Sequence, residues 1–237
     1  MAFVGNNELF ATAFQQYNQF LSDNKVITGT DDAYMVERIG ENIRKAAEKW
    51  LASEGKSSYL RDYSWEYHLV DSNEVNAWCM PGGKIVVYTG ILPLTQTEDG
   101  LATVMGHEVA HALLNHGQQR VSAGILQQLG AVGVAILGSG QSNDTQSLLM
   151  VAYGVGTTLL GTLPFSRKHE SEADHYGLIL MAIAGYNPDA SVPFWERMAA
   201  NGGRVPEFLS THPSDTTRIK QLTESIPVAM QKAAQLR

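Results

Sequence analysis

The chain has 237 residues, of which 44% are hydrophobic and 17% are charged. This composition excludes a disordered chain, a collagen-like fibre and a disulfide-dense small protein, and the length fits one large domain. The 17 basic and 24 acidic residues leave a net charge of −7, so the chain has no general attraction for nucleic acid or anionic lipid. Cys79 is the sole cysteine and cannot form an intramolecular disulfide.

The first 60 residues carry the apolar periodicity of helices. Apolar side chains at helical spacing predict one helix over residues 9–21 and another over 34–50, the second started by Thr30 and two aspartates. The first five residues lack the basic and apolar regions of a secretion signal. We therefore expect either a cytosolic chain or one whose targeting segment has been removed.

The middle of the chain has a strand-like pattern. Alternation and short apolar runs predict three strands, at residues 65–69, 75–80 and 84–89. Pro81, Gly82 and Gly83 form the turn between the last two strands. We expect these strands to form a small antiparallel sheet.

Helices resume after the strands. Thr97 caps a helix with two acidic residues in its first turn, and we expect this helix to end at about Gly117. The weakly polar stretch 121–165 favours a soluble helical hairpin packed against the domain, with a membrane-dipping hairpin as the alternative. Three further helices are predicted over 170–184, 192–200 and 214–235.

These elements together predict a mostly helical α+β fold in one domain, with the small sheet packed on the helix that follows it. The domain would comprise N-terminal helices over 1–60, a core over 61–220 and a C-terminal helix over 221–237.

The predicted helix after the sheet contains His107, Glu108 and His111. Histidines four residues apart lie one turn apart on the same helical face, so both imidazoles can bind one Zn²⁺. Glu108 lies beside them, within reach of a water that such an ion would activate. This combination indicates a metal-dependent hydrolase in which Glu108 is the general base.

A catalytic zinc needs a third protein ligand. Leu114 and Gly117 occupy the places where the metzincin motif needs Gly and His, which excludes that class. Glu170 and Asp174 are four residues apart and share a helical face, whereas Glu172 points away. Glu170 could thus bind the metal while Asp174 accepts a hydrogen bond from a ligand imidazole. The alternative is a solvated acidic first turn, and we interpret His116 as an ordinary histidine at a helix C-terminus.

Several segments together resemble a known family. They are the motif from His107 to His111 and residues 166–174, 210–214, 218–219, 76–77 and 81–90. They resemble the gluzincin zinc metallopeptidases of family forty-eight, which include HtpX, the CaaX prenyl proteases, the mitochondrial Oma-type proteases and the bacterial envelope proteases LoiP and BepA. The resemblance covers roughly residues 67–219, and the soluble LoiP and BepA type is the more similar branch.

The resemblance implies a zincin-like metalloprotease domain that holds one Zn²⁺ per chain through His107, His111 and Glu170. It implies Glu108 as the catalytic base and Asp174 as a partner behind the ligands. It also implies a location in the periplasm or at the outer membrane, with a lipid anchor removed from this chain or the 121–165 hairpin as its membrane contact.

Two further segments are candidates for the site. His212, in a loop that lies near zinc in the family, is a candidate catalytic residue: it could block the metal as a latch, donate to an oxyanion, or simply cap the next helix. Cys79, which we interpret as a buried or half-buried inert thiol rather than a metal-site switch, belongs to an expected edge strand on which an extended peptide substrate could pair. The strand residues involved are Asn76, Ala77, Trp78, Cys79 and Met80.

Three functions compete at this stage. The favoured one is a zinc metalloendopeptidase that acts on unfolded or misfolded envelope proteins in protein quality control. The others are a largely latent, peptidase-derived chaperone or assembly factor, and a non-proteolytic metal-binding or hydrolytic protein. The intact Glu108 argues against a pure metal binder. The oligomeric state stays open.

Overall fold

The structure is a computed structural model that describes residues 6–120, 165–200, 207–212 and 217–236. The predicted hairpin over 121–165 lies outside the described residues except for Phe165. The elements before the site are α1 (Asn6–Asp23), β1 (Val26–Ile27), α2 (Asp31–Ser53), β2 (Glu66–Val70), β3 (Ala77–Met80), β4 (Lys84–Tyr88), η1 (Thr89–Ile91) and α3 (Leu92–Thr95). Those that build and follow it are α4 (Glu98–Leu113), α8 (Arg167–Ile183), η2 (Pro188–Ala190), α9 (Ser191–Ala200), α10 (Glu207–Thr211) and α11 (Arg218–Leu236).

The described strands form one sheet in the order β1-β2-β4-β3. The predicted mostly helical α+β fold is confirmed, but the sheet is mixed: β3 pairs antiparallel with β4, whereas β2 pairs parallel with β4. The tight turn at Gly82 and Gly83, both with positive φ, folds β3 back on the outer side of β4. That leaves β4 to run beside β2 in the same direction. Alternating polarity reports which face of a strand is buried but not its direction, so the expected antiparallel sheet was wrong.

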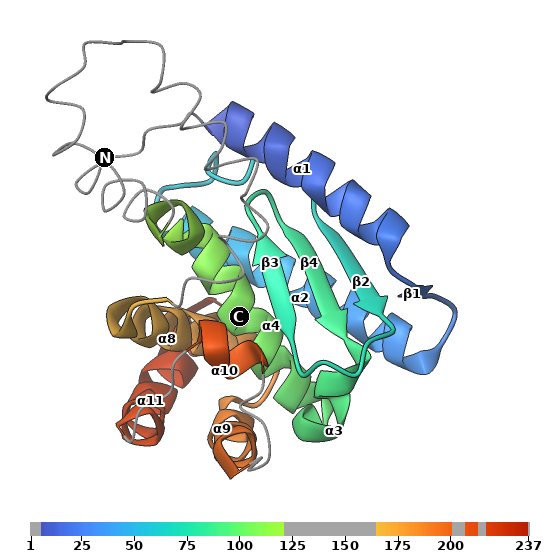
Figure 1. Cartoon of the computed structure of the whole chain (residues 1–237). Coiled ribbons are helices and arrows are strands. Elements are labelled where there is room, and N and C mark those ends of the chain that lie inside the picture. The colour runs from blue at the N-terminus through green and yellow to red at the C-terminus, as the bar shows by residue number, and fades with distance from the viewer. Residues whose placement is uncertain (1–5, 121–164, 201–206, 213–216, 237) are drawn as a thin grey trace, which may run out of the picture.

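Helices cover both faces of the sheet (Figure 1). On one face, α1 packs Tyr17 and Phe20 against Val86 and Tyr88 of β4. On the other face lie α2 and α4, and α8, α9, α10 and α11 lie beyond α4 (Figure 1). Helix α4 is therefore central, and every residue from Gly100 to Leu113 is buried. Within the described residues, every helix is too short or too polar to span a bilayer.

Two glycines let α4 and α8 approach each other closely. A Cβ atom on Gly106 would lie 2.8 Å from the Gly177 carbonyl oxygen, and one on Gly177 would lie 2.9 Å from the His107 amide nitrogen. No side chain can fill either position without pushing the helices apart. The glycine contact therefore sets the distance between the acidic residues of α8 and the histidines of α4.

The end of α4 differs from the prediction. The helix ends at Leu113, and Asn115 adopts a left-handed conformation with φ of 57°. Asparagine tolerates this conformation and replaces the glycine that usually ends a helix. The stop signal is therefore Asn115 rather than Gly117, and the chain is helical again over 116–120. This turn determines where His116 lies.

Candidate metal centre

Helix α4 supplies two of the four converging side chains. The Thr97 side chain accepts a hydrogen bond from the Gly100 amide and fixes the start of the helix. His107 and His111 follow on one buried face, as predicted, and their Nε2 atoms lie 3.0 Å apart. Both side chains are almost completely buried, with 1% and 3% exposure.

Helix α8 brings a carboxylate to these two nitrogens. Ser166 caps the helix by accepting a hydrogen bond from the His169 amide, so α8 begins three residues before the expected Glu170. Glu170 Oε1 lies 3.3 Å from His111 Nε2, and Oε2 lies 3.5 Å from His107 Nε2. The carboxylate thus bridges the two histidines that the sequence placed 59 to 63 residues earlier.

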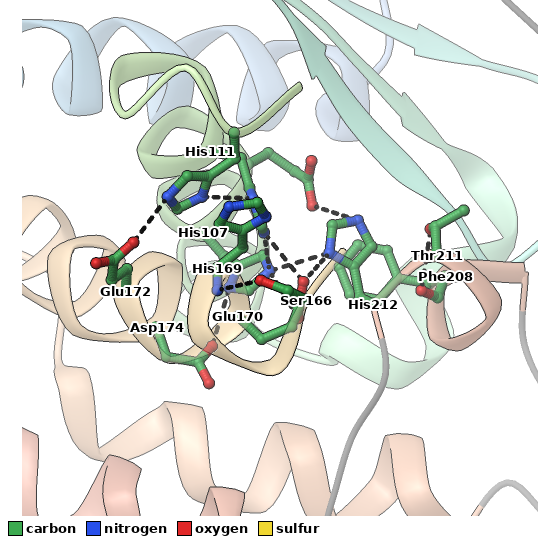
Figure 2. A network of polar contacts seen from close by, with 12 residues as sticks. His107, His111, Ser166, His169, Glu170, Glu172, Asp174, Phe208, Thr211 and His212 are labelled. Atoms are coloured by element: carbon green, nitrogen blue, oxygen red, sulfur yellow. Dashed lines mark hydrogen bonds and ion pairs between the residues drawn. The ribbon is translucent and has the colours of Figure 1, made fainter. Parts of the chain in front are cut away.

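His212 completes the group from the end of α10. Its amide donates to the Phe208 carbonyl, and its ring stacks on the Phe208 ring with centroids 4.4 Å apart. His212 Nδ1 lies 3.1 Å from Glu170 Oε1 and 3.2 Å from His107 Nε2. Figure 2 shows the rings of His107, His111 and His212 gathered around Glu170.

The donor atoms of these four residues fit a zinc ion. They all lie within 4.8 Å of one another, and all four residues are buried. A tetrahedral zinc with ligand bonds of about 2.0–2.1 Å places its ligand atoms roughly 3.3 Å apart. The observed separations of 3.0–3.5 Å agree with that geometry. Three imidazoles and one carboxylate also form a donor set that zinc prefers.

The electrostatics of the group follow from burial and close contact. Burial alone would lower the pKa of His107, but hydrogen bonds to Asp174 and Glu170 outweigh it and raise this pKa to about 9. Burial would raise the pKa of Glu170, yet the surrounding histidines hold it below its usual range. Burial lowers the pKa of His111, which keeps this imidazole neutral and able to bind a metal.

Glu108 lies beside the group with one oxygen available. Burial raises the pKa of its carboxyl group. Within the described part of the chain, Glu108 Oε1 is buried and accepts no hydrogen bond, although it lies 3.4 Å from His212 Nε2. A buried carboxylate oxygen without a donor is suited to receive a water molecule at this place.

Asp174 and Arg218 hold the other side of His107. Asp174 Oδ1 lies 2.9 Å from His107 Nδ1, so the Nδ1–H donates to the carboxylate and Nε2 faces the other ligand atoms. Arg218 donates to the same oxygen at 2.6 Å and forms an ion pair with Glu170 at 3.2 Å. Its guanidinium also stacks on Trp195 at 3.3 Å. In the sequence, Arg218 stands out only as part of the family resemblance, which predicts no role for it.

His116 also belongs to the site, contrary to its interpretation as an ordinary helix-end histidine. It is 1% exposed, and its Nδ1 lies 3.0 Å from Nδ1 of His111. On the other side its Nε2 lies 3.1 Å from Glu172 Oε2. Burial and the neighbouring His169 lower the pKa of His116 to about 4. In the sequence, the only sign of this contact was the position of His116 five residues after His111. A helix that continued unbroken to Gly117 would place His116 on a different face from His111.

Two of the four buried donor residues, His111 and His212, line a cleft of about 530 Å³. The predicted strand residues, Asn76 to Met80, line one side of this cleft, and Glu108, His111 and His212 lie on another. Strand β3 is an edge strand of the described sheet, as predicted. Burial raises the pKa of the Cys79 thiol, in agreement with its interpretation as inert.

The comparisons with known proteins identify the family. The model of peptidase family M48 matches residues 39–226, and the chain belongs to this family. The chain is 38% identical over 178 residues to the mitochondrial metalloendopeptidase OMA1 of Schizosaccharomyces pombe, covering 74% of this chain and 50% of that protein. It is 39% identical over 184 residues to the Arabidopsis thaliana protein of the same name, covering 77% of this chain and 36% of that protein.

A bacterial relative is less similar. The beta-barrel assembly-enhancing protease of Escherichia coli is 28% identical over 164 residues, covering 65% of this chain and 33% of that protein. The family expected from the motifs is therefore confirmed, while the OMA1 proteins have higher identity than this member of the expected bacterial branch. The chain spans between 33% and 50% of the length of these three curated relatives.

Proposed function

We propose that the chain is a zinc-dependent metalloendopeptidase that hydrolyses peptide bonds. The observation that carries this function is the convergence of His107, His111 and Glu170 beside the buried oxygen of Glu108. Membership of peptidase family M48 and the relatives named as metalloendopeptidases support the same reaction class.

The residues have distinct roles in this reaction. His107, His111 and Glu170 hold the zinc, and Asp174 orients His107 through the hydrogen bond to Nδ1. When bound, zinc lowers the pKa of a ligated water to about 7 and polarises a peptide carbonyl. Glu108 takes a proton from the attacking water and passes it to the leaving amine. Its burial supports this role because a raised carboxyl pKa makes the carboxylate a better base.

The substrate would bind to β3 as an additional strand. Tyr88 donates to the Asn76 carbonyl, and hydrogen-bonded pairs recur at every second residue of an antiparallel pair. Trp78 therefore pairs inward with Val86, while the amide of Cys79 points away from β4. An extended peptide that pairs with this edge of the described sheet would lie in the cleft beside Glu108.

The position of His212 favours a latent state as the second candidate. A catalytic zinc site keeps one ligand position open, whereas four protein donors close it. Here His212 Nδ1 takes the place of a fourth donor at 3.1 Å from Glu170. We infer that His212 is a latch, and that a largely latent peptidase with a chaperone or assembly role is the alternative function.

The proposed substrates are unfolded or misfolded proteins of the cell envelope, in the periplasm or at the outer membrane, with a lipid anchor as the membrane contact. The resemblance of the motifs and the relative named for beta-barrel assembly support these proposed substrates and this location. Fractionation of cells that produce the protein tests it, and recovery in another compartment would contradict it.

The decisive experiment compares Glu108→Gln with the wild type in casein hydrolysis and zinc content. The amide keeps the shape of the carboxylate but cannot accept a proton, so we expect full zinc content and at least a ~100-fold loss of hydrolysis. Glu196→Gln, at an exposed position of α9, is the matched control and should keep full activity. Chelator-resistant cleavage, or undiminished cleavage by Glu108→Gln, would contradict the proposed function.

A further inference from the structure

The Nδ1 atoms of His107 and His111, the two histidines on α4, have different kinds of hydrogen-bond partner. His107 Nδ1 meets a carboxylate directly, at 2.9 Å from Asp174. Among the residues that the structure describes, His111 Nδ1 meets no carboxylate but another imidazole nitrogen, His116 Nδ1, at 3.0 Å. A carboxylate then follows one residue further out, because His116 Nε2 lies 3.1 Å from Glu172 Oε2.

The proton positions along this chain follow from hydrogen-bond chemistry. If His111 Nε2 binds a metal, its proton must be on Nδ1, because a neutral imidazole carries one proton. The Nδ1–H of His111 then donates to His116 Nδ1, which must be an acceptor. His116 therefore carries its own proton on Nε2 and donates it to the Glu172 carboxylate. His111, His116 and Glu172 therefore have a single arrangement of protons in which both contacts between them are hydrogen bonds.

The surroundings fix this chain in place. The left-handed turn at Asn115 brings His116 back beneath His111. The His116 ring stacks on His169 with centroids 4.4 Å apart and planes inclined by 19°, which sets its orientation. Glu172 is part-exposed and forms an ion pair with Lys168 at 3.8 Å on the solvent side.

We propose that His116 and Glu172 are positioning residues for the metal, which hold the proton on His111 Nδ1 and keep His111 Nε2 open for zinc. This role presupposes the zinc site of the proposed function. Partners of this kind typically change metal affinity by 10- to 100-fold when they are removed. Glu172 thus acts on the site through two imidazoles, although its own carboxylate lies outside the group of metal-binding donors.

Two substitutions at His116 separate positioning from packing. His116→Asn puts its side-chain oxygen near the former Nδ1 and can still accept from His111, whereas His116→Phe keeps a ring of similar shape without an acceptor. We expect the zinc dissociation constant to rise about 10- to 100-fold in His116→Phe and less than about threefold in His116→Asn. A residue that only packs would give the reverse order, and that result would overturn the proposal.

Substitutions at Glu172 test the same chain of hydrogen bonds without disturbing the core, because this side chain is 40% exposed. Glu172→Gln retains an oxygen that accepts from His116 and should bind zinc like the wild type, while Glu172→Ala should bind about tenfold more weakly. Lys168→Ala removes the solvent-side partner of Glu172 and should leave the affinity unchanged. Equal affinity of Glu172→Ala and the wild type would overturn the role of the carboxylate.

The measurement is zinc binding in competition with a chromophoric chelator, with the melting temperature of each metal-free variant as the test of folding. This readout is independent of peptide hydrolysis. A wild-type chain that binds zinc but is insensitive to His116→Phe would contradict only the positioning role. A folded wild-type chain that binds no zinc would overturn the proposed function and the positioning role together.

Discussion

Arg218 is the cation that compensates the buried acidic groups behind the metal centre. Its side chain is 4% exposed, donates to Asp174 at 2.6 Å and pairs with Glu170 at 3.2 Å. The substitution Arg218→Met keeps an unbranched chain of similar length over Trp195 but removes the charge and the donors. In the metal-free protein, Asp174 and Glu170 then lose their shared guanidinium inside the fold.

The structure gives the size of this effect. Removing one partner of a buried ion pair costs about 3–5 kcal/mol, because the other partner remains charged and poorly solvated. Each 1 kcal/mol shifts the melting temperature of a domain of 150–250 residues by about 2–4 °C. We therefore expect the metal-free Arg218→Met variant to melt about 6–20 °C below the wild type. Bound zinc should reduce this loss because it supplies a cation to Glu170.

The assay is thermal unfolding of the metal-free and zinc-loaded proteins, followed by circular dichroism. Lys220→Met is the matched control, because Lys220 is 78% exposed on the same helix and its ion pair within the described part of the chain is with Glu224, at 3.8 Å. Such a surface pair contributes about 0–1 kcal/mol. An Arg218→Met variant as stable as the Lys220→Met control would refute the compensating role of Arg218.

Three further predictions concern the latch, the substrate strand and the metal. His212→Ala should raise casein hydrolysis because it removes the fourth donor; a ~100-fold fall would instead identify an oxyanion donor, and an unchanged rate would contradict both roles. Cys79→Pro should reduce peptide cleavage with zinc content unchanged, because its amide points away from β4; equal cleavage by Cys79→Pro and the wild type would argue against strand addition. Zinc at 1,000 times its dissociation constant adds about 4 kcal/mol of stability, so a chelator should lower the melting temperature by about 8–16 °C, and no shift would contradict zinc binding by the folded chain.

Local sequence patterns were sufficient for the elements that position the centre. The Thr97 cap and the apolar period predict α4, and four-residue spacing predicts that His107 and His111 share a face, because both signals act within a few turns of one helix. The same spacing argument separated Glu170 from Glu172. The observed helix ends differ from the predicted ones where a single residue interrupts the apolar pattern, as Asn115 does at the end of α4.

The sequence by itself thus determined the class of fold, the metal motif and the carboxylate that joins it. Tertiary structure alone decided the direction of β2 beside β4, the distance of His212 from the other donors and the contacts of Arg218 and His116. These depend on contacts between residues far apart in the chain, such as the glycine contact of α4 with α8, and no local period encodes them. The motif predicts which residues can bind zinc. Helix packing sets the 3.0–3.5 Å separations that allow their ligand atoms to bind one zinc ion together.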